Sequence, residues 1–333
     1  MHRQGKHGVG EASGSPRRKG NAAEKMKALI LTDGKAGHEN QSKAFARGVG
    51  CEFDILPVRF KSKAAKALSY LLDNLGIRTT ALFDGFEEKL EDCGYCAVLG
   101  TGSGTFYAAK TIARRLNVPC GVVLLPRGYS IGSFDCILAP AFDNPPSAPN
   151  IIEIPVNLVA ADASFYEAGV KSFREKRDCE TESKNAVAVI VGGPNKCSTM
   201  TPEWMRSQLE GIFSVHKAVG HEIWVTTSRR TPPEVEAVVD SFPFDYKLLY
   251  SRDHFNPIPA FVSLASHLYV TAESTGMLSE ACSFGKAEVH VMDNLLPGPH
   301  KFRRFAETCA RLGTEKVDLS DRFAAAKSLL GLS

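Results

Sequence analysis

Short runs of apolar residues alternate with longer amphipathic stretches from residue 27 to residue 160. The apolar runs are mostly continuous, which is typical of parallel strands that are buried on both faces. We expect strands at 27–32, 53–58, 95–100, 120–125, 134–139 and 151–156. Helices are expected between them, notably at 39–48, 63–75 and 104–116. Strands separated by helices form βαβ units.

The same alternation restarts at residue 186. Strands are expected at 186–193, 222–228, 246–251, 267–272 and 287–292. Helices are expected at 202–219, 232–241, 257–266, 276–284, 301–312 and 320–330. Thr201-Pro202 marks one helix start, and Thr231-Pro-Pro-Glu234 has the form of a capping box. The sequence therefore predicts an α/β protein with two Rossmann-like, doubly wound parallel-sheet domains that face a cleft.

A polar, helix-prone stretch at 161–185 interrupts the pattern and is interpreted as a linker. It separates an N-terminal Rossmann-like domain at 26–160 from a C-terminal one at 186–300. We expect the helices within 301–333 to pack back on the N-terminal domain. Residues 1–25 are rich in Gly, Ser, Arg and Lys, which predicts a disordered basic tail.

Charge and cysteine content exclude several classes of protein. Seven basic and two acidic residues give residues 1–27 a net charge of +5, so the rest of the chain carries −2 of the total of +3. Because the folded body has no basic face, we expect no nucleic-acid partner. The basic tail favours at most a peripheral contact with anionic lipid, such as the inner membrane, since no apolar run reaches the ~20 residues of a membrane span.

Nine cysteines without framework spacing favour a reducing compartment, and we expect the protein to be cytoplasmic. Cys93 and Cys96 form a CxxC that leads into a strand rather than a helix. A second pair at zinc-site spacing is missing from the sequence, so we expect no metal and no cofactor.

Ligands of doubly wound sheets bind beyond the carboxyl ends of the strands, so the turns after the strands carry the candidate chemistry. The first turn runs from Asp33 to Gln41. Its glycines allow close backbone approach, and His38 is a candidate general base because free histidine titrates near neutral pH. The alternative interpretation is a tight turn whose polar side chains only cap the helix. The second turn, at 100–105, is rich in glycine but lacks the Gly-Lys-Ser/Thr ending of a nucleoside triphosphatase.

Two turns of the C-terminal domain suit a diphosphate. The turn at 192–196 is accompanied by Ser228-Arg229-Arg230, and an arginine ahead of a helix can hold a diphosphate in bidentate fashion. The segment Ser274-Thr275-Gly276 offers hydroxyls and backbone amides at a helix start, which favours phosphate. Glu280 follows in the same helix and can accept hydrogen bonds from a ribose diol. Solvated arginines, a plain helix cap and an ordinary helical glutamate are the alternatives.

The motifs DGKAGHENQS, GGPNK, TTSRRTP and VTAESTGMLSEACSFGK resemble the plant mitochondrial-fission (elongated mitochondria) protein family and its bacterial relatives, over roughly residues 27–312. The resemblance implies a GT-B-like fold and a metal-independent glycosyltransferase. Such an enzyme moves a sugar from a nucleotide-sugar to a glycan or lipid-linked acceptor of the cell envelope. The chain departs from the family pattern at 141–143 and at Ile258.

This resemblance, together with the turns, gives three sets of expected site residues. The catalytic residues are His38 and Asp33. The donor or phosphate site comprises Gly192, Gly193, Lys196, Ser228, Arg229, Arg230, Ser274, Thr275, Gly276 and Glu280. The acceptor side comprises Gly34, Gly37, Asn40, Gln41, Gly102, Ser103 and Gly104.

Two other functions stay open at this point. A non-catalytic adaptor of the mitochondrial-fission type would use the same fold without turnover. A nucleotide-binding regulatory module would bind the donor without forming a product. Some members carry nucleoside-diphosphate-sugar epimerase labels, but a TyrxxxLys pair after a dinucleotide fingerprint is missing from this sequence.

Overall fold

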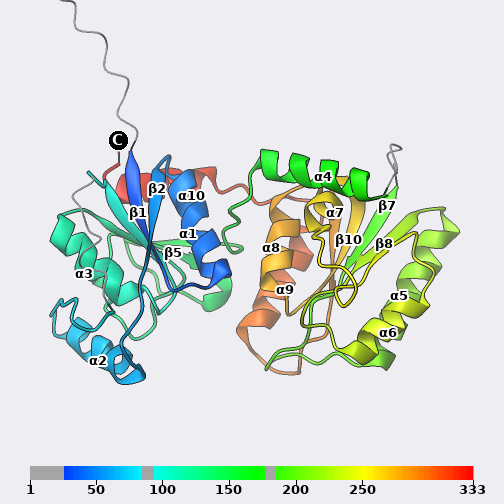
Figure 1. Ribbon diagram of the computed structural model, residues 1–333, viewed down its shortest axis with the longest axis horizontal. Coiled ribbons are helices and arrows are strands. Elements are labelled where there is room, and N and C mark those ends of the chain that lie inside the picture. The colour runs from blue at the N-terminus through cyan, green and yellow to red at the C-terminus, as the bar shows by residue number, and fades with distance from the viewer. Residues whose placement is uncertain (1–25, 85–93, 178–184, 333) are drawn as a thin grey trace, which may run out of the picture.

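The computed structural model describes residues 26–84, 94–177 and 185–332. Two α/β halves lie side by side (Figure 1). The N-terminal half contains a six-stranded sheet in the order β2-β1-β3-β4-β5-β6, and the C-terminal half a five-stranded sheet in the order β11-β10-β7-β8-β9. Every neighbouring pair of these strands is parallel. The expected fold class, two doubly wound parallel-sheet domains, is confirmed.

The N-terminal half follows the βαβ pattern closely. Its strands are β1 Lys27–Thr32, β2 Glu52–Pro57, β3 Ala97–Thr101, β4 Cys120–Val123, β5 Cys136–Pro140 and β6 Ile151–Ile154. Its helices are α1 Ala36–Gly48, α2 Lys63–Asn74 and α3 Phe106–Leu116, with short 3-10 turns η2 Ile131–Ser133 and η3 Ala141–Asp143. The chain goes from β1 to β2 on one side and from β3 onward on the other, so the order of strands reverses between β1 and β3.

Helix α4, Ala163–Arg177, follows the crossing from the N-terminal half and packs on the C-terminal half. The strands of the C-terminal half are β7 Ala186–Ile190, β8 Glu222–Thr226, β9 Tyr246–Leu248, β10 Ala265–Thr271 and β11 Glu288–Met292. Its helices are α5 Pro202–Ala218, α6 Pro233–Ser241, α7 Ile258–Leu264, α8 Thr275–Ser283 and α9 Lys301–Leu312. Here the order of strands reverses between β7 and β10. Each half therefore has a switch point at the carboxyl edge of its sheet, where doubly wound folds bind ligands.

One of the two predicted helix caps is wrong. Thr201 does cap α5, because its hydroxyl accepts a hydrogen bond from the amide of Trp204 at 3.2 Å. The capping box expected at Thr231 does not form, since Pro232 is the N-cap of α6 and its side chain makes no cap bond. The Thr231 hydroxyl donates instead to the carbonyl of Gly192 at 2.6 Å. Thr231 therefore bonds to a distant turn rather than capping its own helix.

The C-terminus returns to the N-terminal half (Figure 1), where helix α10, Ser320–Leu329, packs near β5, β6 and α1. Ala326, Leu330 and Leu332 are buried in the same apolar cluster as Phe45 and Leu138. The last helix thus completes a core that begins with the first strand.

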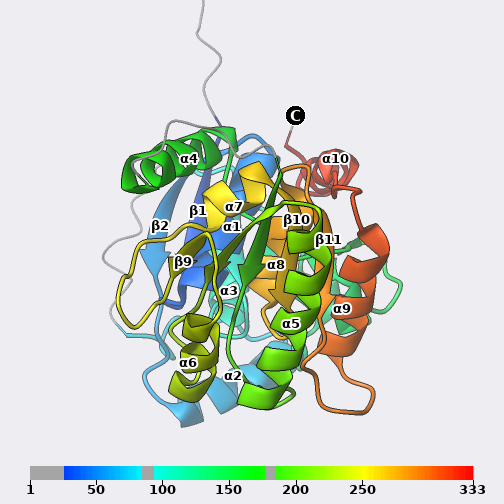
Figure 2. The same cartoon turned by 90° about the vertical axis from the view of Figure 1, so that its right-hand side faces the viewer.

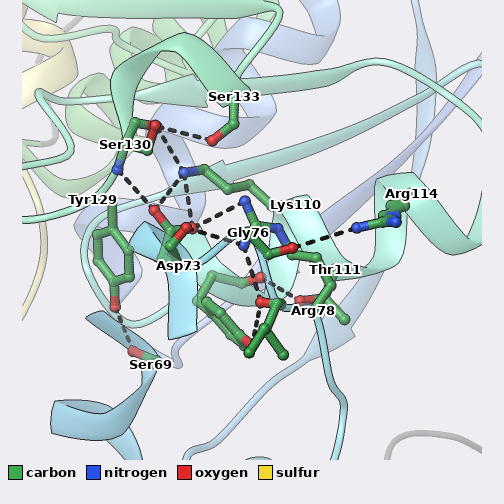
Figure 3. A network of polar contacts seen from close by, with 12 residues as sticks. Ser69, Asp73, Gly76, Arg78, Lys110, Thr111, Arg114, Tyr129, Ser130 and Ser133 are labelled. Carbon is green, nitrogen blue, oxygen red and sulfur yellow. Dashed lines mark hydrogen bonds and ion pairs between the residues drawn. The ribbon is translucent and has the colours of Figure 1, made fainter. Parts of the chain in front are cut away.

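A buried ionic network ties α2 to α3 (Figure 3). Lys110 Nζ lies 3.0 and 2.9 Å from the two carboxylate oxygens of Asp73, and both side chains are almost fully buried. The Ser130 amide donates to the same carboxylate at 2.7 Å, and Arg78 forms an ion pair with it at 3.3 Å. Burial lowers the pKa of Lys110, while the Asp73 carboxylate opposes the shift. Every polar group at the centre of this network has partners.

Among the described residues, none of the helices combines the length and the apolar character that a bilayer crossing requires. The described cysteines are free, and Cys51 and Cys96 lie with their sulfur atoms 3.6 Å apart. Cys93, the other cysteine of the CxxC, lies outside the described residues.

Candidate functional site

The switch point of the N-terminal half brings two of the expected turns together. Asp33 follows β1, and its two carboxylate oxygens lie 3.1 and 3.0 Å from Nδ1 of His38 in the first turn of α1. Lys35 Nζ also contacts this carboxylate at 3.0 Å. Burial acts to raise the pKa of Asp33, but the hydrogen bond from Lys35 and the charge of His38 hold the pKa below its ordinary value. Asp33 is therefore an anion that orients the imidazole.

The glycine-rich turn after β3 packs directly on this pair. Gly102 has a φ of +82°, and a Cβ at this position would lie 2.4 Å from the His38 ring. A Cβ at Gly104 would lie 2.7 Å from Asp33. Ser103 accepts a hydrogen bond from Lys66 at 2.8 Å. Glycine is thus required here because the imidazole and the carboxylate occupy the space a side chain would fill.

At the switch point of the C-terminal half, two backbone amides are already hydrogen-bonded to side chains of the protein. The amide of Gly192 donates to the Thr271 hydroxyl at 2.9 Å, and the amide of Gly193 donates to Oε1 of Glu273 at 2.7 Å. These two amides are therefore engaged and do not face a ligand. The other carboxylate oxygen of Glu273 and both side-chain polar atoms of Asn294 are buried and lack a hydrogen-bond partner within the described residues.

Helix α8 starts beside this switch point. Thr275 and Gly276 occupy its first turn, where backbone amides have no partner within a helix. Glu280 lies one turn further on and accepts a hydrogen bond from Tyr166 of α4 at 3.1 Å. Burial raises the pKa of Glu280 above its usual range, and the bond from Tyr166 opposes that rise.

A cleft of about 820 Å³ separates α1 from α8, within the range of small-molecule sites. It brings together residues expected on both sides of the fold. From α1 come Gly37, Asn40 and Gln41, and from α8 come Thr275, Gly276 and Glu280. The connection between the halves closes one side of the cleft, with residues from Asn157 to Ala168.

Other expected residues, including Asp33, His38 and the turn of Gly102 to Gly104, are not among those that line this cleft. Ser274 is buried at the start of α8, and Lys196, Arg229 and Arg230 are exposed on the turns after β7 and β8. The Ser228 amide donates to the Thr231 hydroxyl at 2.9 Å, which holds its turn closed. Gly34 has a φ of +78° and shapes the turn after β1.

Lining residues that the sequence analysis missed lie on helix faces. Lys43 and Arg47 follow Asn40 at three- and four-residue steps along α1, and Ser279 follows Thr275 by four residues along α8. This spacing is the signal that could have found them, since such residues share one face of a helix. Lys43 and Arg47 bring two cations to the cleft, where Lys43 pairs with Glu39 at 2.7 Å and Arg47 lies 4.0 Å from Asp162.

A comparison of the sequence with known protein families assigns this chain to one of them. The sequence profile described as Mitochondrial fission ELM1 matches residues 36–317, which is most of the chain. The chain belongs to the mitochondrial fission ELM1 family. A relative of this ELM1-family chain, uncharacterized protein RP120 of Rickettsia prowazekii (strain Madrid E), is 31% identical over 110 residues. The match covers 31% of this chain and 30% of RP120, so the chain spans about a third of that relative's length.

Among solved structures, the ELM1-family chain is similar to UDP-GlcNAc 2-epimerase from Neisseria meningitidis bound to UDP-GlcNAc, at 12% identity and a TM-score of 0.49, over 92% of this chain and 98% of that one. It is also similar to MurG of Acinetobacter baumannii, at 11% identity and a TM-score of 0.42, over 92% and 100% of the two chains. The glycosyltransferase SnogD from Streptomyces nogalater is 14% identical, with a TM-score of 0.40, over 92% and 95%.

Proposed function

We propose that this ELM1-family protein is a glycosyltransferase that binds a nucleotide-sugar in the cleft between α1 and α8. The observation that carries the proposal is that Thr275, Gly276 and Glu280 line the same cleft as Asn40 and Gln41 of the opposite half. The diphosphate lies at the start of α8, and the ribose diol bonds to Glu280. The sugar then points toward the turn of Asp33 and His38.

The start of α8 supplies what a departing diphosphate needs. The amides of Thr275 and Gly276 lie at the positive end of the helix dipole, which favours an anion. Lys43 and Arg47 add positive charge from α1. Fixed amides and cations can stabilise the charge that develops on a leaving group without a metal ion.

The acceptor is activated by His38. Its Nδ1 faces the Asp33 carboxylate, so the tautomer with a proton on Nδ1 leaves Nε2 free to take a proton. Asp33 stabilises the imidazolium that forms when His38 takes the proton from the acceptor hydroxyl. Gly37, the neighbour of His38, lines the cleft.

A panel of uridine, guanosine and adenosine diphosphate sugars tests the donor site. We expect one of them to raise the Tm of the full-length protein, and Glu280→Gln to remove the shift. Tyr166→Phe is the matched control, since it deletes the hydrogen bond to Glu280 but keeps the carboxylate. A panel that leaves the Tm unchanged, or an undiminished shift in Glu280→Gln, overturns the proposal.

A second candidate is a non-catalytic adaptor, which the description of the family as mitochondrial fission proteins favours. Slow hydrolysis of the bound nucleotide-sugar separates the two candidates. A transferase should release sugar slowly, and His38→Ala should abolish that release. An adaptor should release no sugar, and the wild type and His38→Ala should bind its partner equally well.

A further inference from the structure

Four histidines and a glutamate gather on the C-terminal sheet, away from the cleft. His216 lies in the last turn of α5 and His221 on the turn before β8. His267 belongs to β10, and Glu288 and His290 belong to β11. In the register of these parallel strands, His267 is paired with Glu288, and Tyr269 with His290. The four strand residues thus share one face of the sheet, and α5, β10 and β11 can be followed in Figure 2.

The ligating atoms of this cluster lie close together. His267 Nδ1 is 3.0 Å from His290 Nε2 and 3.6 Å from a carboxylate oxygen of Glu288. The other Glu288 oxygen is 3.9 Å from His290 Nε2. Behind this trio, His216 Nδ1 and His221 Nδ1 are 3.0 Å apart, and His216 Nε2 contacts the Tyr269 hydroxyl at 2.9 Å.

These separations match those around a tetrahedral zinc ion. Zn–N bonds of about 2.0–2.1 Å put two ligand atoms roughly 3.3 Å apart. His267 Nδ1 and His290 Nε2 are 3.0 Å apart, and each has its own nearest Glu288 oxygen, at 3.6 and 3.9 Å respectively. One ligand atom from each of the three residues lies within 4.8 Å of the other two. An ion between these atoms therefore needs only small side-chain movements. Two imidazoles with one carboxylate are a donor set that zinc accepts.

The trio is also accessible from solvent. The side chains of His267, Glu288 and His290 are 27%, 45% and 30% exposed, so an ion can enter from solvent.

We propose that His267, Glu288 and His290 bind one Zn²⁺ ion, with a water molecule in the fourth position. His216 and His221 lie behind the ligands, and the centroids of the His216 and His267 rings are 5.0 Å apart. The site lies at the amino ends of β10 and β11, on the edge of the sheet opposite to Thr275 and Glu280. The ion ties the edge strand β11 to β10 and stabilises the C-terminal half.

Zinc binding is measured on the full-length protein, purified without a polyhistidine tag and stripped with a chelator. We expect one Zn²⁺ per chain by metal analysis and a Tm that rises by about 5–10 °C when free Zn²⁺ is a hundredfold above Kd. Mg²⁺, which prefers oxygen ligands, should leave the Tm unchanged. Co²⁺ should give the visible absorption of a tetrahedral site.

The variants His267→Ala and Glu288→Gln should each weaken Zn²⁺ binding by at least about a hundredfold. Exposed His254 lies outside the cluster, so His254→Ala is the matched control and should bind like the wild type. Circular dichroism of the metal-free variants checks that they fold, and Glu288→Gln changes a partly exposed group and preserves its shape. Absence of saturable Zn²⁺ binding overturns the proposal. Binding that survives Glu288→Gln but is lost in His221→Ala overturns this ligand set.

Discussion

Asp73 and Glu280 are two carboxylates that the fold shields from water, and their surroundings differ. Asp73 accepts hydrogen bonds from Lys110 and from the Ser130 amide, and Arg78 pairs with it. Glu280 accepts one bond, from Tyr166, and lines a cleft of about 820 Å³. A buried charge whose partners all come from the protein holds helices together, whereas a carboxylate with spare acceptors at a cleft can receive a ligand.

The largest expected effect comes from breaking the Asp73 network. Asp73→Ala leaves Lys110 buried without its anion, and we expect the free energy of unfolding to fall by about 3–5 kcal/mol. Urea unfolding measures this loss. The matched control is Asp54→Ala, because Asp54 pairs with Lys27 at 2.7 Å on the surface and should contribute less than about 1 kcal/mol. Equal losses in the two variants would contradict a structural role for the Asp73 network.

The pair of Asp33 and His38 should be sensitive to the shape of the glycine turn that packs on it. Gly102→Ala forces a Cβ into the His38 ring, whereas Gly34→Ala meets the same positive φ with open space around it. We expect the free energy of unfolding to fall by at least about 1 kcal/mol more in Gly102→Ala than in Gly34→Ala, because the added methyl group overpacks only the first site. Chemical denaturation of both variants tests this.

A smaller effect is expected for Glu280→Gln. The amide still accepts the bond from Tyr166 and no longer has to be desolvated as a charge. We expect the free energy of unfolding to change by less than about 1 kcal/mol, in either direction. A loss as large as that of Asp73→Ala would place Glu280 among the structural carboxylates and remove the contrast between them.

The smallest effect is a dependence on pH. Because the pKa of Glu280 is raised by folding, the protonated form is favoured in the folded protein, and this contribution to stability is lost as pH rises above the ordinary value of 4.5. Wild type should therefore lose stability relative to Glu280→Gln as pH rises through that window. Under the proposed function, ligand affinity should move the opposite way in wild type, since an ionised carboxylate accepts both hydrogen bonds of a diol. If the stability of wild type and of Glu280→Gln depends on pH in the same way, the pKa of Glu280 is not raised by folding.

Most of the fold could be predicted from the sequence. Continuous apolar runs such as Ala186–Ile190 identify parallel strands, and the helix Lys301–Leu312 begins and ends where its pattern predicts. Some strand ends were predicted too long. Strand β4 ends at Val123, although Leu124 and Leu125 are apolar, because the backbone turns at Leu124, which has a φ of +73°. Local patterns identify elements well, since each element buries its own apolar face.

Long-range partners could not be predicted in this way. The Thr231 hydroxyl bonds to the carbonyl of Gly192, and the amides of Gly192 and Gly193 bond to Thr271 and Glu273. A single motif cannot reveal such bonds, because their partners lie far away in the sequence. The histidine cluster was missed because its members come from three separate parts of the chain. A signal was present, since His267 and Tyr269 on one strand, and Glu288 and His290 on the other, place polar side chains two residues apart.

The return of α10 to the first half has a mechanical consequence. Phe323 lies over Gly48, where even a methyl group would clash with its ring, so the last helix is seated against the first one. The polypeptide therefore passes between the halves twice, once before α4 and once before α10 (Figure 1). A domain motion that widens the cleft must therefore bend both connecting segments at once. Two connections restrict the relative motion of the halves more than a single linker would.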